Sequence, residues 1–112
     1  MHEMSLAESV LSLVEETARR ENVGMVKTVV LEIGALANVE IEALRFCFEA
    51  ARRSVTKDAA LEIQEIPGQG WCLPCGEAVL LARLGDLCPR CGSGQVQPTM
   101  GMEMRVKEIE IE

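Results

Sequence analysis

Four cysteines in the C-terminal part of this 112-residue chain constrain its fold more than any other feature. They form two Cys-x-x-Cys pairs that twelve residues separate, a spacing typical of a site that holds one tetrahedral zinc ion. A glycine follows each pair, and glycine readily adopts the positive φ that such tight turns need. The predicted zinc ligands are Cys72, Cys75, Cys88 and Cys91, followed by Gly76 and Gly92.

A zinc ion held by four thiolates has no open position for water or substrate, so the predicted site is structural and not catalytic. Two alternatives use the same residues: a pair of disulfides, or a redox-active Cys-x-x-Cys. The two Cys-x-x-Cys pairs carry proline and glycine at matching positions, which favours a metal site over both of these alternatives. The chemistry of the chain must therefore be sought outside the zinc site.

The composition narrows the choice of partners. The formal net charge is −7, and four thiolates around Zn²⁺ would make it more negative. Because nucleic-acid-binding surfaces are basic, and the chain has only three aromatic residues for base stacking, we expect no nucleic-acid partner. The longest apolar run is far too short to span a bilayer, so we expect no membrane association. A fifth cysteine, Cys47, fits a reducing cytoplasm and is expected on the apolar face of a helix.

Apolar periodicity predicts helices and strands in alternation. A capping-box pattern at Ser5 predicts a first helix with Leu6, Val10, Leu13 and Val14 on its buried face. A strand is predicted over residues 26–33, a second helix after Asn38, and a short strand over 61–64. A last strand begins near Met102, and consecutive polar residues at 107 and 108 predict a bulge or a change of buried face there. Met100, Met102 and Met104 are expected to pack against a helix rather than to bind Cu(I).

These elements define an α+β fold, in which a small three- to four-stranded sheet is packed by two helices. The turn-forming segment Pro67–Gly70 is expected to link the sheet to an inserted zinc-ribbon module with four cysteine ligands. We expect residues 1–66 plus 98–112 to form an α/β domain, and residues 67–97 to form the zinc-binding domain.

The amino terminus offers a second metal site of a different kind. A retained Met1 followed by His2 supplies an amine, a deprotonated backbone amide and an imidazole in series, and such adjacent chelate rings favour a square plane. Ni(II) and Cu(II) prefer this geometry, whereas structural zinc does not. Chain ends are commonly disordered, so Met-His at a terminus is weak evidence when it stands alone.

Four sequence segments strengthen the evidence for a metal site at the amino terminus. The opening Met-His-Glu-Met-Ser, residues 30–36 (Val-Leu-Glu-Ile-Gly-Ala-Leu), residues 42–48 (Glu-Ala-Leu-Arg-Phe-Cys-Phe) and the paired cysteines occur in this order. Together they resemble the HypA/HybF family of nickel-insertion proteins in hydrogenase maturation. The resemblance covers nearly the whole chain.

The resemblance implies a nickel metallochaperone that delivers Ni(II) for the maturation of [NiFe] hydrogenase and also carries a structural zinc site. It implies that nickel binds at Met1, His2 and Glu3, with help from Glu40 where family members have Asp; Glu40 could instead stabilise a helix N-terminus. It implies a HypB-type GTPase and the hydrogenase large subunit as partners. It leaves open whether urease maturation proteins are also partners, and whether the chain forms a homodimer. The alternative is a zinc-ribbon interaction adaptor without a transferable metal.

Overall fold

A computed structural model of the chain describes residues 2–112, which divide into two compact units. The first unit holds the chain up to Leu31, together with Val39–Ile63 and Val106–Glu112. The second unit holds Glu32–Asn38 and Gln64–Arg105. The division into a domain of residues 1–66 plus 98–112 and a zinc-binding domain of residues 67–97 stays a prediction.

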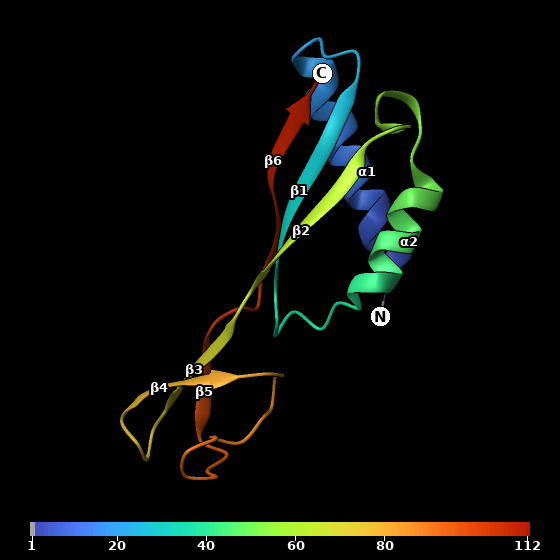
Figure 1. The fold of residues 1–112 in the computed structure, drawn as a ribbon. Coiled ribbons are helices and arrows are strands. Elements are labelled where there is room, and N and C mark those ends of the chain that lie inside the picture. Colours follow the sequence, from blue (N-terminus) through green and yellow to red (C-terminus); the bar gives the residue numbers. More distant parts are fainter. Residues whose placement is uncertain (1) are drawn as a thin grey trace. The chain divides into compact units, whose positions relative to one another are not determined.

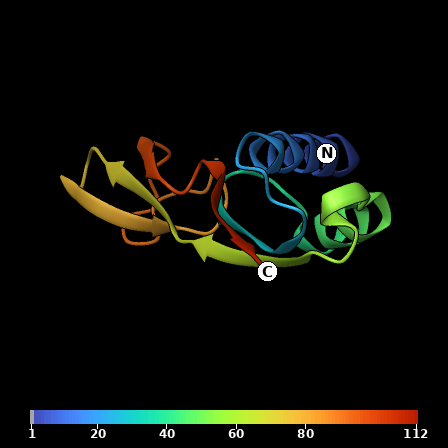
Figure 2. The same ribbon diagram turned by 90° about the horizontal axis from the view of Figure 1, so that it is seen from above.

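In the first unit, two helices pack on one side of a sheet (Figures 1 and 2). The helices are α1 (Glu3–Arg20) and α2 (Ile41–Ala51), and a 3₁₀ turn, η1 (Ser54–Thr56), follows α2. The sheet has the strand order β2-β1-β6. Its strands are β1 (Val26–Gly34), β2 (Ala60–Ile66) and β6 (Met104–Ile111), parts of which extend into the second unit.

The core of the first unit is aliphatic and aromatic, with side chains from both helices against the sheet. Branched residues suit the central strand β1 because they pack well on a pleated surface. Fully buried side chains of this unit include Leu11, Val14, Val29, Leu31, Leu44 and Phe48.

The second unit contains an antiparallel sheet with the order β4-β3-β5. Its strands are β3 (Gly68–Cys72), β4 (Glu77–Leu81) and β5 (Val96–Met100). Trp71 in the central strand lies opposite Ala78 on one side and Gln97 on the other. The buried cluster of this unit is small, and two of its five members are cysteines: Leu36, Cys72, Val79, Leu81 and Cys88.

The α+β class with two helices is confirmed, but the predicted arrangement of strands is incomplete. The described residues form two three-stranded sheets: the predicted sheet that two helices pack against, and a second sheet that was not predicted. The prediction that Pro67–Gly70 forms a linker is wrong, because Gly68 and the residues that follow it form β3. Pro98 lies within β5, which is an edge strand where a missing N–H is tolerated.

Both predicted helix starts are wrong. The first helix begins at Glu3 with His2 as its N-cap, three residues before the predicted cap at Ser5. The second begins at Ile41 with Glu40 as its N-cap, whereas Asn38 adopts a left-handed conformation with φ of 58°. The local capping preferences of Ser5 and Asn38 are overridden by packing and by the turn that precedes α2.

Side-chain burial confirms some pattern-based predictions and corrects others. Leu13 is exposed, and so are Met100 and Met102, so the packing expected of these residues is wrong. The predicted change of face in β6 is confirmed, because Val106 and Ile109 are both half-buried across two exposed polar residues. Neither helix in the described part of the chain is both long and apolar enough to cross a bilayer.

Candidate metal centres

Two tight turns carry the four predicted zinc ligands. In the first turn the N–H of Gly76 donates to the carbonyl of Cys72 at 2.8 Å, and in the second the N–H of Gly92 donates to the carbonyl of Cys88 at 2.9 Å. Both glycines have positive φ, 65° and 77°, as the sequence predicted. The sequence around each pair therefore folds into the local geometry that brings two sulfurs to one side of a turn.

The structure brings all four sulfurs together. The Sγ atoms of Cys72, Cys75, Cys88 and Cys91 lie within 4.8 Å of one another. Sγ of Cys72 is 3.6 Å from that of Cys91, and Sγ of Cys75 is 4.0 Å from that of Cys88. Sulfurs placed about 2.3 Å from a central zinc would lie about 3.8 Å apart, so the donor set fits a tetrahedral zinc ion. The same distances are far beyond a disulfide bond.

The thiols have strongly divergent acidities because they share a small space. Hydrogen bonds with Cys91 and Cys72 raise the pKa of Cys75 to about 12. The N–H of Cys91, with help from that of Arg90, lowers the pKa of Cys88 to about 7. Four adjacent sulfurs cannot all ionise without a cation between them. A divalent soft metal removes that conflict by holding every thiol as a thiolate, which is the chemistry that this cluster is suited to perform.

The amino-terminal candidate residues lie where α1 begins. His2 is the exposed N-cap of α1, and its imidazole makes no capping hydrogen bond. The carbonyl of His2 accepts the first helical bond, from the N–H of Leu6 at 2.9 Å. Met1, which the resemblance implies as a nickel ligand, lies outside the described residues. The N–H groups at the start of a helix have no carbonyl partner within the helix, so they remain chemically accessible.

Glu3 joins the start of α1 to the start of α2. Its side chain is only 8% exposed, and its Oε2 accepts the N–H of Glu40 at 3.1 Å. This N–H lowers the pKa of Glu3, although burial opposes the effect. The carboxylate of Glu40 in turn accepts the N–H of Glu42 at 3.4 Å, which makes Glu40 an N-cap residue. Glu40 therefore caps the start of α2, which is the alternative to nickel binding that the sequence left open for this residue.

The sequence reasoning did not foresee that the Glu3 side chain is buried. A signal was available, because Glu3 precedes Ala7 by four residues, Ala7 precedes Leu11 by four, and all three lie on the buried stripe of α1. Moving the helix start back by one turn places the carboxylate on that stripe. A buried carboxylate needs a hydrogen-bond donor, and the N–H of Glu40 supplies it.

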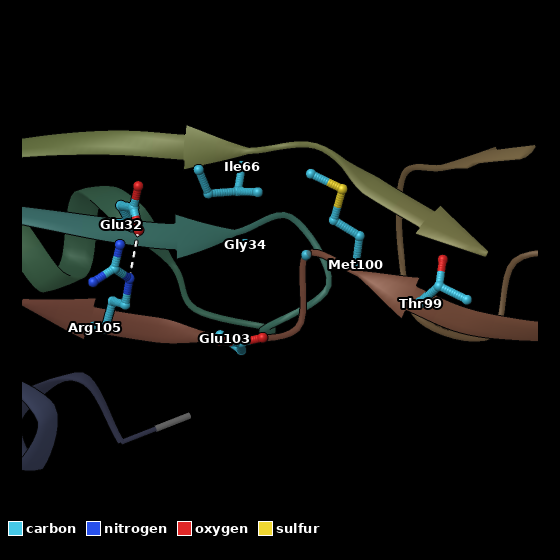
Figure 3. Close-up of a pocket in the computed structure, with 8 residues that line it drawn as sticks. Glu32, Gly34, Ile66, Thr99, Met100, Glu103 and Arg105 are labelled. Atoms are coloured by element: carbon cyan, nitrogen blue, oxygen red, sulfur yellow. Dashed lines mark ion pairs between the residues drawn. The ribbon is translucent and has the colours of Figure 1, made fainter. Parts of the chain in front are cut away.

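A further cavity of about 270 Å³ lies in the second unit (Figure 3). An ion pair spans it between Nε of Arg105 and Oε1 of Glu32, at 2.6 Å. The backbone around it is tightly bonded, since the N–H of Gly34 donates to the carbonyl of Glu103 at 2.8 Å. This cavity lies where chain segments meet closely, and the ion pair of Arg105 with Glu32 leaves Glu103 as a further carboxylate in its lining.

The fold and the cysteine cluster together define a small α+β metal-binding protein with a site of four thiols. The sequence model of the family described as "Hydrogenase/urease nickel incorporation, metallochaperone, hypA" matches residues 1–111. The chain belongs to this HypA family of hydrogenase maturation factors, whose members are metallochaperones and not enzymes.

Relatives of full length support the assignment. The chain is 64% identical over 113 residues to "Hydrogenase maturation factor HypA" of Dechloromonas aromatica (strain RCB), with complete coverage of both proteins. It is 53% identical over 112 residues to the protein of the same name from Azoarcus sp. (strain BH72), with 99% of this chain and 98% of the relative covered.

Solved structures agree with the sequence relatives. One is described as "Solution structure of the Ni metallochaperone HypA from Helicobacter pylori"; it is 31% identical, with a TM-score of 0.69, and covers 99% of this chain and 97% of that one. A second, "Solution structure of HypA protein", is also 31% identical, has a TM-score of 0.71, and covers 100% and 97% of the two chains. The predicted family is confirmed.

Proposed function

We propose that this chain captures Ni(II) at its amino terminus and delivers it for the maturation of [NiFe] hydrogenase. The ligand positions are Met1, His2 and Glu3, with Glu40 nearby. The observation that carries the proposal is the hydrogen bond between Oε2 of Glu3 and the N–H of Glu40, because it ties together positions that are 37 residues apart in the sequence. His2 directly precedes Glu3 and keeps its imidazole exposed.

The chemistry of capture follows from the ligand types. A terminal amine, backbone amides and an imidazole must all lose protons before they bind a metal, so the affinity for nickel falls as pH falls. The amides next to His2 can lose their protons without breaking a helical hydrogen bond, because they lie at the open end of α1. In this proposal Glu3 contributes its backbone amide, since its carboxylate is already engaged with Glu40.

The four cysteines are proposed to hold a structural zinc ion. Tetrathiolate zinc is closed to further ligands and exchanges nothing during the nickel cycle. Its function is to fold the second unit, whose buried cluster is too small to be stable without it. Nickel and zinc thus use separate ligands of different chemical character.

Delivery needs partners, which we infer to be a HypB-type GTPase and the hydrogenase large subunit, with the cytoplasm as the compartment. The sequence has no Gly-rich phosphate-binding loop of the nucleotide-hydrolase type. A separate GTPase would therefore supply any nucleotide-driven step. Urease maturation proteins are a second class of client that the family description suggests.

The proposal is tested with protein that keeps its native first residue. Wild type, His2→Ala and protein whose terminal amine is acetylated are loaded with zinc and titrated with Ni(II) by isothermal calorimetry. We expect all three to hold the same zinc, and only the wild type to bind nickel tightly. Loss of one chelate ring should weaken binding by at least about 100-fold, the scale of a change of roughly 3 kcal/mol.

The same titration separates the metallochaperone from the adaptor without a transferable metal. An adaptor would bind nickel equally weakly in all three proteins. Glu16→Ala is a matched control, because Glu16 is exposed on α1, far along the helix from its start. Equal loss of nickel affinity in Glu16→Ala and His2→Ala would contradict the proposal.

A further inference from the structure

One of the four cysteines in the cluster is open to solvent. Cys91 is exposed, whereas Cys72 and Cys88 are buried, with 0% and 3% of their surface exposed, and Cys75 is half-buried. The thiolate is the form of cysteine that reacts with oxidants, and a metal holds its cysteine ligands in that form. Cys91 is therefore the residue of the cluster that a small oxidant in solution meets first.

A second cysteine lies beside Cys91. The Sγ atoms of Cys91 and Cys72 are 3.6 Å apart, closer than the 4.0 Å between the Sγ atoms of Cys75 and Cys88. A disulfide places its two sulfurs about 2.05 Å apart, so a small movement of the two side chains closes this gap. Cys72 is the last residue of β3, and Cys91 lies in the turn of the other cysteine pair, so such a bond would connect the two pairs.

We propose that Cys91 is a site of oxidation by hydrogen peroxide, and that Cys72 converts the oxidised Cys91 into a disulfide. Sγ of Cys91 attacks one oxygen of the peroxide; an S–O bond forms, the O–O bond breaks and hydroxide leaves. Sγ of Cys72 then attacks the sulfenic acid of Cys91; an S–S bond forms, the S–O bond breaks and a second hydroxide leaves. The two thiolates lose two electrons in total, and the peroxide gains them.

The inference rests on the proposed zinc site, because the disulfide would remove two of its four thiolates. Cys75 and Cys88 alone are an incomplete donor set for structural zinc, which takes four ligands. Cys72 is also a member of the small buried cluster of the second unit. Peroxide should therefore unfold the second unit and leave the first unit folded. A thiol reductant and added Zn²⁺ should restore it, since thiol–disulfide exchange reverses the bond.

The first test identifies the disulfide in the zinc-loaded full chain. The protein is treated with hydrogen peroxide, its remaining thiols are alkylated, and tryptic peptides are analysed by mass spectrometry. Cleavage after Arg83 and Arg90 leaves the first cysteine pair in one peptide and each cysteine of the second pair in a peptide of its own. We expect the main disulfide to join Cys72 to Cys91. A main disulfide between Cys88 and Cys91, or zinc release without any disulfide, would overturn the proposal.

The second test measures which thiol reacts first, and it needs no variant that could fail to fold. Brief treatment of the zinc-loaded chain with iodoacetamide should alkylate Cys91 at least about tenfold faster than Cys72 or Cys88, because only Cys91 of these three is exposed. Mass spectrometry of the tryptic peptides measures the three rates. Equal rates, or a faster reaction of Cys72 or Cys88, would overturn the assignment of Cys91.

The third test follows zinc release with a chromophoric chelator, with and without peroxide, while free thiols are counted. We expect two thiols to be lost for each zinc ion that peroxide releases. Cys47→Ser is the matched control, because Cys47 is a half-buried thiol on α2 outside the cluster. That variant should release zinc at the rate of the wild type, and slower release would overturn the proposal.

The zinc content before oxidation separates this inference from the proposed function. Protein that is isolated without zinc, and that does not take it up, would contradict the zinc site itself. Zinc that is bound and stays bound in excess peroxide would overturn this inference alone.

Discussion

The two units of the molecule differ in the interactions that stabilise each of them. The first has a core of large aliphatic and aromatic side chains from two helices and a sheet, with Leu11, Leu44 and Phe48 at most 1% exposed. The second has a buried cluster of five residues, two of which are thiols that also face the proposed metal. Hydrophobic burial stabilises the first unit, whereas we propose that a metal ion stabilises the second.

This difference suits a carrier of metal. A unit that hydrophobic burial stabilises stays folded whether or not a metal ion is bound to it. A metal-stabilised unit can be small and still present a fixed surface. Substitutions that act on one unit alone test this difference.

Removal of zinc should have the largest effect. Structural zinc contributes on the order of 10 kcal/mol to small domains, so Cys72→Ser or strong chelation should unfold the second unit. The single tryptophan, Trp71, lies in β3 and reports this through its fluorescence. The helical circular dichroism of the first unit should persist. Cys47→Ser is the control, since Cys47 is outside the cluster; loss of zinc in that variant would contradict the assignment.

A substitution that creates a cavity in the core of the first unit should have the next largest effect on stability. Leu11 is fully buried on α1, and Leu11→Ala should lower the free energy of unfolding of that unit by about 3 kcal/mol. Chemical denaturation followed by helical circular dichroism measures this change, while zinc content stays constant. Leu13→Ala should have little effect, because Leu13 is 47% exposed. Zinc loss in Leu11→Ala would mean that the units are not stabilised separately.

A crowded glycine in the second unit gives a smaller effect. A Cβ on Gly34 would collide with the backbone of Gly101, at the point where their segments are joined by the hydrogen bond from the N–H of Leu36 to the carbonyl of Gly101. Gly34→Ala should therefore destabilise the unit by about 2 kcal/mol. Gly24→Ala is the control, because nothing lies within 4 Å of that position. Equal thermal shifts in the two variants would contradict the close packing.

The smallest effect concerns the pH dependence of stability. Because the pKa of Glu3 is lowered in the folded chain, its charged form contributes stability above its ordinary pKa of 4.5, and this is lost as pH falls further. Glu3→Gln keeps an oxygen for the N–H of Glu40 but cannot titrate. The difference in melting temperature between wild type and Glu3→Gln should therefore shrink below pH 4.5. A constant difference across that range would contradict the role of the charge.

Features set by spacing could be predicted from sequence, whereas features set by long-range contacts could not. The cysteine spacing and its glycines led to the correct cluster and turns, because the geometry is local. The start of α1 was misjudged, since Ser5 has good capping chemistry but Glu3 gains a donor from a residue 37 positions away. Strands β3 and β5 were missed because glycine and proline within them normally indicate turns.

The most direct test of the central claim is X-ray absorption at the nickel and zinc edges of one sample, prepared with the native first residue and one equivalent of each metal. The account predicts zinc surrounded by four sulfurs at about 2.3 Å and nickel surrounded by nitrogen and oxygen only. Sulfur in the shell of the nickel ion, or nitrogen in that of the zinc ion, would contradict it.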